Sequence, residues 1–314
     1  MVNSKKNIYM PSRLTRGNVV ELVGALNFFF ESAGQKIRDV FLYFDRVNKV
    51  DVLGVLVLYK FLEFSVMHSC FENPTFNLTY NKYLDNEIGK FGFSGLIAAL
   101  MNNKAKEHYY KNLDTQVTAD FILAPIAILR GKDMRSQKKK AQQEIANYYG
   151  DNDTTAMILQ VFSEIFQNFL SHAETDNRSI VVMHGDKQKI VFACADNGVG
   201  ILNSMKKNPR YSSLKAEAML QKSLMRGVTS KEGTNHLGYG LYYINEVVSR
   251  LGGQLIIYTD RYYLHNRAGK ASILKLHNWL GTIIYVTIPL HQAVTIDDIE
   301  TDSDINNDIK INYI

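Results

Sequence analysis

Three short motifs in the second half of the chain constrain its fold most. The first lies in residues 155–173, TAMILQVFSEIFQNFLSHA, where apolar residues recur at helical spacing. On this predicted helix Glu164, Asn168 and His172 are four residues apart and form one row. An amide oxygen can ligate magnesium and a neighbouring carboxylate can orient or deprotonate water, so the row suits a magnesium–phosphate group. Taken alone, the helix fits a solvated polar face equally well.

The second motif follows a predicted β-hairpin. Residues 179–195, SIVVMHGDKQKIVFACA, predict two strands joined by a polar turn, and the second strand runs straight into Asp196, Asn197 and Gly198. A carboxylate at a strand end can accept the exocyclic amine of adenine. The alternate glycines, Gly198 and Gly200, let the backbone turn sharply and approach a base closely. An ordinary turn is the alternative explanation of this motif by itself.

The third motif is a glycine-flanked helix start. Gly238-Tyr239-Gly240 precedes an apolar-periodic helix over 241–251, which Gly252-Gly253 ends. The N-terminus of such a helix presents free backbone N–H groups and the positive end of the helix dipole to phosphates. Upstream, Lys231 lies on a predicted loop from which it could reach a terminal phosphate. An exposed loop lysine is the alternative.

In this order the motifs resemble those of the GHKL superfamily, which includes sensor histidine kinases, gyrase, a heat-shock chaperone, mismatch-repair ATPases and anti-sigma-factor kinases. EIFQNFLSHA resembles the N box, DNGVGI the G1 box, GYGLYYINEVVSRLGG the G2 box and GTIIYVTIP the closing strand. The resemblance covers about residues 150–290. It implies a two-layer α/β sandwich of the GHKL (Bergerat) type, with a mostly antiparallel sheet, and makes residues 202–237 the ATP lid.

The resemblance also implies ATP and Mg²⁺ as ligands. Asp196 would bind the adenine amine with the help of Thr282, and Asn168 would ligate the magnesium ion. Glu164 is the candidate general base, and Lys231 completes the predicted catalytic residues. The remaining cofactor-binding residues, which would shape the base pocket or contact phosphates, are Gly198, Gly200, Ile201, Gly238, Tyr239, Gly240 and Leu241.

The use of the ATP is less constrained. The upstream histidines, His68 and His108, lack the pattern of a phospho-accepting histidine, so autophosphorylation in cis is not expected. We favour an enzyme that hydrolyses Mg-ATP or transfers its γ-phosphate to a serine or threonine of an unknown partner protein, as an anti-sigma-type kinase does. A conformational ATPase, in which lid closure drives homodimerisation or partner exchange in stress or defence, and a non-enzymatic nucleotide sensor stay open.

The N-terminal part is less informative. DVFLYFDRVNKVDVLGVLVLYKFLE, residues 39–63, weakly resembles the STAS pattern of a strand, a loop with Asp45 and Asp51, and a helix starting near Gly54. A generic α/β unit explains it as well. We expect a smaller N-terminal α/β domain over 1–130 that binds a partner if it is STAS-like. The other predicted parts are a basic linker over 131–150, the ATP-binding domain over 151–291 and an acidic mobile tail over 292–314.

Composition sets outer limits. The chain of 314 residues is 46% hydrophobic and 21% charged, which is typical of a globular protein. Its net charge of +5 permits contact with a phosphate but does not indicate nucleic-acid binding. The two cysteines, Cys70 and Cys194, have no CxxC spacing, so a zinc site or a disulfide framework is not expected. We therefore expect a soluble cytoplasmic protein that does not enter the membrane.

Overall fold

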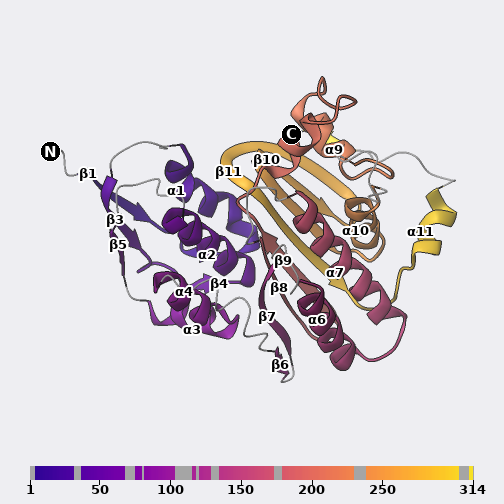
Figure 1. Ribbon diagram of the computed structural model, residues 1–314, viewed down its shortest axis with the longest axis horizontal. Helices are drawn as coiled ribbons and strands as arrows, with labels where there is room; N and C mark the ends of the chain where they lie inside the picture. The colour runs from indigo at the N-terminus through magenta and orange to yellow at the C-terminus, as the bar shows by residue number, and fades with distance from the viewer. Residues whose placement is uncertain are drawn as a thin grey trace.

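Two β-sheets of unequal size, with helices between and beside them, organise the chain (Figure 1). The larger sheet is built mostly from the second half of the sequence, and the smaller one comes from the N-terminal part. The computed structural model describes residues 4–31, 37–67, 75–79, 81–102, 115–117, 120–128, 134–172, 179–229, 238–303 and 311–313.

The large sheet forms the centre of the molecule. Its described strands follow the order β10-β11-β9-β8-β7-β6, with β12 beside β11. Neighbouring strands are antiparallel except for the β11–β12 pair. These strands are β6 (Thr115–Val117), β7 (Phe121–Ile128), β8 (Ser179–Gly185), β9 (Lys189–Ala195), β10 (Gln254–Arg267), β11 (Lys270–Pro289) and β12 (Ile311–Tyr313).

The β10–β11 hairpin is the longest pairing in the described sheet. Its ladder runs from Gln254 opposite Thr287 to Arg267 opposite Lys270. Ala268 and Gly269 form the two-residue turn, and their φ angles of 49° and 81° are both positive. Positive φ at both turn positions matches the right-handed twist of the flanking strands. The end of β11, residues 283–289, pairs with β9. The second sequence motif begins directly after β9.

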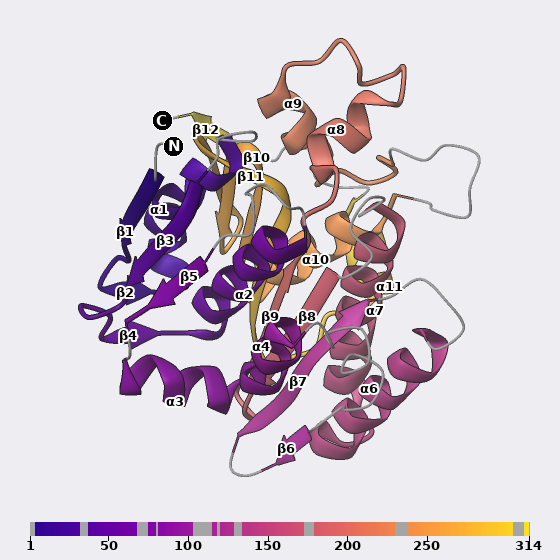
Figure 2. The ribbon, with the colours of Figure 1, turned by 60° about the vertical axis from the view of Figure 1, so that its left-hand side comes forward.

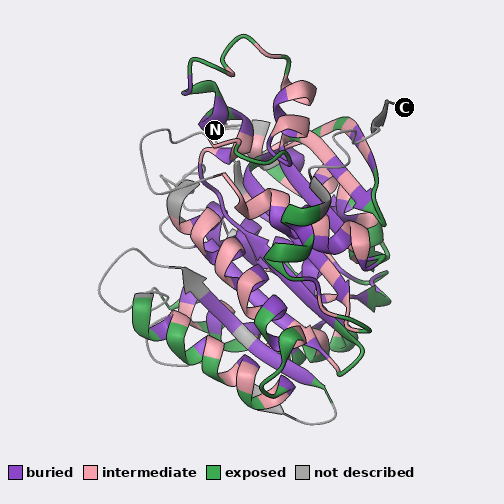
Figure 3. Cartoon of the chain, turned by 90° about the vertical axis from the view of Figure 1, so that its right-hand side faces the viewer, coloured by how far each residue is buried: buried purple, intermediate pink, exposed green. Residues whose placement is uncertain are grey.

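Helices from the second half cover one face of the large sheet. Phe162 and Phe166 of α7, and Val247 of α10, share a core with alternate strand residues such as Phe192 and Ile257. In Figure 3 the strands behind these helices are almost wholly buried. The α/β sandwich predicted from the sequence is confirmed. The helices are α6 (Met134–Tyr149), α7 (Asp153–His172), α8 (Gly200–Lys206), α9 (Ala216–Lys222) and α10 (Gly240–Arg250).

The opposite face is covered as well, by α1 (Val19–Glu31) and α2 (Val52–Met67) (Figure 2). The other alternate strand residues, including Ala193 and Tyr285, share a second core with Leu22 and Leu56 of these helices. Because both faces are buried, the strands are nearly continuous apolar runs instead of alternating ones. The apolar pattern of the sequence did not indicate which elements cover this second face.

The N-terminal elements form a small parallel sheet on the far side of α1 and α2 (Figure 1). Its strand order is β1-β3-β5, and a separate parallel pair joins β2 to β4. The additional elements here are β1 (Ser4–Tyr9), β2 (Arg13–Leu14), η1 (Arg16–Asn18), β3 (Ile37–Tyr43), β4 (Lys49–Val50), β5 (Thr75–Leu78), α3 (Lys82–Lys90) and α4 (Phe93–Met101).

The loop singled out for its STAS-like pattern has a structural role. Asp51 caps α2: its Oδ1 accepts hydrogen bonds from the backbone N–H groups of Leu53 and Gly54 at 3.0 and 3.1 Å. A Cβ on Gly54 would lie only 2.0 Å from the carbonyl oxygen of Leu14, so only glycine lets α2 approach β2 this closely. Asp45 is exposed. A STAS-like partner-binding domain remains a prediction.

Two of the predicted segment boundaries differ from the structure. Residues 134–149 form α6 and not a linker, because Ala141, Ile145 and Tyr149 make an apolar stripe that packs in the α7 core while Lys139 and Lys140 stay exposed. β7 likewise pairs with β8 of the large sheet although it precedes residue 130. The element order therefore continues across the predicted domain boundary.

The predicted mobile tail also begins as ordered structure. Residues 296–303 form α11 (Ile296–Ser303), and Val294 and Ile299 are each only 2% exposed. These two apolar residues were hidden in the sequence by the acidic residues around them. Within the described residues, no helix combines the length and the apolar composition needed to cross a bilayer. Lys60, which interrupts the apolar run of α2, is fully buried and pairs with Glu63 at 2.6 Å.

Candidate functional site

A cavity of about 530 Å³ lies between α7, α10, the end of β9 and α11. It brings together nine of the residues predicted from the sequence, which come from four separate motifs. Gly198 and Gly200 do not line it, and Lys231 lies outside the described residues. The nine are Glu164, Asn168, Asp196, Ile201, Gly238, Tyr239, Gly240, Leu241 and Thr282.

Asp196 is held firmly at the end of β9. Its Oδ1 accepts a hydrogen bond from the backbone N–H of Gly198 at 2.6 Å, and its own N–H donates to the carbonyl oxygen of Thr282 at 2.9 Å. The Trp279 indole Nε1 donates to the Asp196 carbonyl oxygen at 3.1 Å. These contacts fix the backbone and one carboxylate oxygen of a residue that is 4% exposed and lines the cavity. A carboxylate so placed can accept a ligand N–H group.

Gly281 belongs to this end of the cavity, although the sequence analysis did not single it out. Its φ is 102°, and a Cβ there would lie 2.6 Å from Asp196 Oδ1 and 2.3 Å from the Asp196 carbonyl oxygen. Only glycine therefore lets β11 pack this closely against Asp196. The signal that could have found it is a glycine inside a predicted strand, immediately before Thr282.

Gly200 sets the start of α8. Its φ is +76°, and a Cβ would lie 2.9 Å from Thr259 Oγ1 and 3.1 Å from Asp260 Oδ2. The same Thr259 hydroxyl accepts the N–H of Ile201 at 3.0 Å. Burial raises the pKa of the neighbouring Asp260 to about 6, against the charge of Lys206 and its own hydrogen bonds. Thr259 and Asp260 were also missed, because nothing in QLIIYTD distinguishes them from strand-end residues.

Glu164 and Asn168 lie one turn apart on α7 and face the N-terminus of α10. A Cβ on Gly240 would lie 2.8 Å from Glu164 Oε2 and 2.9 Å from Asn168 Nδ2, so the helix start is in direct contact with the polar row. Asn168 Nδ2 is buried and has no hydrogen-bond partner in the described part of the chain. A buried amide without a partner is rare and indicates a missing ligand or water.

Burial shifts the protonation equilibrium of the Glu164 carboxyl group toward the neutral form. Burial raises its pKa above the usual value, while a hydrogen bond from Gln160 Nε2 at 2.7 Å and the charge of Lys138 act in the opposite direction. A carboxylate with a raised pKa is a stronger base when ionised. Lys138 lies on α6, and burial in turn lowers its pKa.

Gly238 closes the loop that precedes α10. Its φ is +72°, and a Cβ would lie 2.7 Å from backbone atoms of Gly227 and Val228. The backbone at Gly238 therefore lies directly against the backbone of Gly227 and Val228. Next to this contact, Arg226 Nε donates to the Tyr239 hydroxyl at 3.1 Å, and its guanidinium lies over the Tyr239 ring.

The cavity residues fit an adenine nucleotide with magnesium. At one end Asp196 offers an acceptor for an amine, and apolar side chains such as Met205 and Ile284 can contact a flat ring. At the other end a glycine-flanked helix start and an unpartnered amide can take phosphate oxygens. A magnesium ion, when bound here, could take the Asn168 amide oxygen and phosphate oxygens as ligands.

Comparison with known families matches residues 153–292 to the model described as histidine kinase-, DNA gyrase B-, and HSP90-like ATPase. Residues 153–292 are a domain of this ATPase family. No curated protein matches the chain. The GHKL resemblance stated from the motifs is thus confirmed for residues 153–292.

The matched ATPase domain begins with α7 and ends just after β11. β6, β7 and α6 precede it although they continue its sheet and its helical layer. α11 follows it, and yet Ile296, Ile299 and Glu300 line the cavity. Part of the wall around the candidate site thus comes from residues that the family match does not include.

Proposed function

We propose that the chain binds Mg-ATP in the cavity between α7 and α10 and hydrolyses it, as a regulatory ATPase. The observation that carries the proposal is that one cavity has suitable polar residues at both of its ends. Asp196 stands at the end of a strand, and Glu164 and Asn168 stand against Gly240, all on the lining of one cavity.

In this proposal each end has its own task. The Asp196 carboxylate accepts the adenine amine, with Thr282 beside it. The N–H groups from Gly238 to Leu241 and the positive end of the α10 dipole bind phosphate oxygens, and the Asn168 amide ligates magnesium. Magnesium, when bound, offsets the negative charge that develops on the phosphates.

Glu164 accepts the proton of the attacking water. The water oxygen forms a bond to the γ-phosphorus, the bond from that phosphorus to the bridging oxygen breaks, and ADP leaves with the electron pair. A raised pKa for Glu164 favours this proton transfer. If the hydroxyl of a partner serine or threonine takes the place of water, the same arrangement makes a protein kinase.

The test uses ATP labelled on its γ-phosphate and measures where the label goes. The variant Asp196→Asn removes the acceptor for the adenine amine. We expect the wild-type chain with Mg²⁺ to release labelled inorganic phosphate, and Asp196→Asn to lose ATP binding by a factor of at least about 100, since a buried acceptor is replaced by a donor. Asp45→Asn, which changes an exposed carboxylate, is the matched control and should bind normally.

The outcomes separate the alternatives. Label on protein would indicate transfer to a partner or to a second copy of the chain. Binding without turnover would contradict hydrolysis and favour a nucleotide sensor. No binding by the wild type, or unchanged binding by Asp196→Asn, would contradict the site itself.

The proposal extends to the setting of the protein. An ATP-dependent regulator is expected in the cytoplasm, where ATP is supplied, and it needs a partner to regulate. The N-terminal elements are the proposed partner-binding part. Their small sheet exposes Tyr9, which stacks on Tyr43 at a centroid distance of 4.7 Å. Loss of partner capture on replacing Tyr9, with ATP binding unchanged, would support this assignment.

A further inference from the structure

The segment that follows the ATPase domain forms one wall of its cavity. α11 contributes Ile296, Ile299 and Glu300 to the lining, although the family match ends at residue 292. A nucleotide entering this cavity must therefore meet a helix that the matched domain does not supply. We call residues 293–303 the strap.

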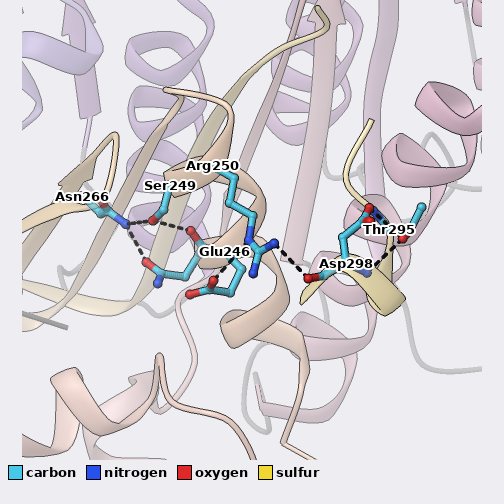
Figure 4. A network of polar contacts seen from close by, with 7 residues as sticks. Glu246, Ser249, Arg250, Asn266, Thr295 and Asp298 are labelled. Atoms are coloured by element: carbon cyan, nitrogen blue, oxygen red, sulfur yellow. Dashed lines mark hydrogen bonds and ion pairs between the residues drawn. The ribbon is translucent and has the colours of Figure 1, made fainter. Parts of the chain in front are cut away.

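The strap docks through a few specific contacts. The Val294 N–H donates to Met157 Sδ at 3.4 Å, and the Tyr243 hydroxyl donates to the Val294 carbonyl oxygen at 3.3 Å. The side chains of Val294 and Ile299 are buried in the core of α7 and α10. Figure 4 shows the outer contact, in which Arg250 Nη1 donates to the Asp298 carbonyl oxygen at 3.0 Å.

These contacts place the strap at the Glu164 end of the cavity. Met157, Gln160 and Glu164 follow one another at helical spacing along α7, and the strap docks on the first of them. Tyr243 of α10 lines the cavity together with Glu164, and its hydroxyl donates to Val294 of the strap at 3.3 Å. With adenine at Asp196, this is the end that would hold the terminal phosphate.

The strap presents an acidic group to that end. Glu300 lines the cavity, and its Oε1 pairs with Arg226 Nη2 at 3.2 Å. Arg226 in turn donates to the hydroxyl of Tyr239, the residue between Gly238 and Gly240. The Glu300 carboxylate thus lies beside the Arg226 guanidinium. A phosphate group of the nucleotide could bind the same guanidinium.

We infer that the strap is an internal competitor of the nucleotide. When the strap is docked, its Glu300 carboxylate and its apolar residues occupy the terminal-phosphate end of the cavity. Mg-ATP binds fully only when the strap withdraws. This inference rests on the proposed binding of ATP in the same cavity. It adds a regulated state to that function, because whatever captures the released strap favours the ATP-bound form.

The strap is built so that it can leave its docking site. It is an eight-residue helix, too short to be stable by length alone. Thr295 and Asp298 form a reciprocal cap, since each side chain accepts the backbone N–H of the other at 3.2 and 2.8 Å (Figure 4). The cap is internal to the strap and does not depend on the ATPase domain, whereas the Arg226–Glu300 pair is exposed and easily exchanged.

The first test compares three full-length variants by titration with a non-hydrolysable ATP analogue and Mg²⁺. Glu300→Gln removes the competing charge, and Ile299→Ser removes the main apolar anchor. Both should bind the analogue about 5-fold or more tightly than the wild type, at the lower end of typical coupling between sites. Asp297→Asn removes the same charge from the same helix at an exposed position that does not line the cavity, and its affinity should not change.

Weaker binding by Glu300→Gln and Ile299→Ser would overturn the inference, because the strap would then be part of the binding wall. Unchanged affinity in both would overturn it too, because the strap would be a bystander. Failure of the wild type to bind the analogue at all is a different result, which contradicts the proposed function. Glu300→Gln keeps the shape of the side chain and carries the test if Ile299→Ser does not fold.

The second test reads the strap directly. A protease that cuts after glutamate should cleave the wild type at Glu300 several-fold faster when the Mg²⁺ analogue is saturating, because an undocked eight-residue helix can unfold into the extended form that a protease binds. Asp196→Asn should show no acceleration. Protection of Glu300 by the nucleotide would overturn the competition, since it would mean that ATP and the docked strap are bound together.

Discussion

At the scale of single residues, the candidate site depends on glycines that allow contact between neighbouring motifs. Gly240 touches the carboxylate of Glu164 and the amide of Asn168, and Gly281 touches Asp196. The polar partners were predicted because their spacing is visible along one helix or one strand end. Gly281 was not, because the clash that excludes a side chain there arises between segments 85 residues apart (281 − 196).

Gly240→Ala should reduce ATP affinity by at least about 10-fold. The added Cβ would displace Glu164 Oε2 and the Asn168 amide, and overpacking of this kind costs roughly 1–3 kcal/mol. Titration with Mg-ATP measures the loss. Gly89→Ala in α3, where a Cβ meets only Ser94 Oγ at 3.5 Å, is the control and should bind ATP normally. Normal ATP affinity in Gly240→Ala would show that the phosphates bind elsewhere.

Lys138→Met should move the acid limb of ATP hydrolysis to higher pH. Burial already raises the pKa of Glu164, and the Lys138 charge is one of the two effects that lower it again. A base acts only when ionised, so activity is lost as pH falls through its pKa, and removing the cation makes that loss begin at a higher pH. The measurement is kcat against pH. Lys139→Met, at an exposed position of the same helix, should leave the limb where it is.

At the scale of elements, the sequence predicted those whose apolar pattern is strong and missed those whose pattern is masked by charge. α7, α10 and the strands around them were foreseen from periodicity and glycine punctuation. α6 was taken for a linker because six basic residues over 130–140 outweighed the spacing of Ala141, Ile145 and Tyr149. α11 was taken for a mobile tail for the same reason with the opposite sign of charge.

Gly54→Ala should destabilise the fold by roughly 1–3 kcal/mol, because the new Cβ would lie 2.0 Å from the Leu14 carbonyl oxygen and force α2 away from β2. Thermal unfolding measures the change, with Gly89→Ala as a control in a helix that has room for the methyl group. An unchanged melting temperature for Gly54→Ala would mean that the contact is relieved without cost. It would also reopen a functional reading of this glycine.

At the scale of the whole molecule, one sheet serves two cores. Helices of the ATPase domain pack on one face, and α1 and α2 pack on the other. The sequence indicated buried strands but gave no sign of which elements cover each face, since long apolar runs are alike on both sides. That assignment depends on contacts between residues far apart in the chain.

His184 of β8 makes the stability of the fold sensitive to pH. Burial, with the charges of Lys189 and Lys90, lowers its pKa from 6.5 to about 4, and its ring contacts Phe91 at a centroid distance of 5.5 Å. The neutral ring is the folded form. Its contribution to stability is complete above pH 6.5 and is lost as pH falls toward 4, by up to roughly 3 kcal/mol.

Chemical unfolding at pH 7 and pH 4.5 measures this loss. His184→Gln cannot titrate and should show a smaller fall in stability between the two pH values than the wild type. His291→Gln, at an exposed position, should keep the full fall. Equal pH dependence in His184→Gln and the wild type would assign the effect to other groups.

Trp279, the one tryptophan of the chain, joins the two halves of the molecule. Its indole contacts the Phe30 ring of α1 at a centroid distance of 5.2 Å and donates to the backbone of Asp196 at 3.1 Å. The one tryptophan therefore lies where a displacement of the N-terminal helix and the arrival of adenine would both alter its surroundings. The tryptophan emission spectrum of the unlabelled protein can report whether adenine binding and displacement of α1 are coupled.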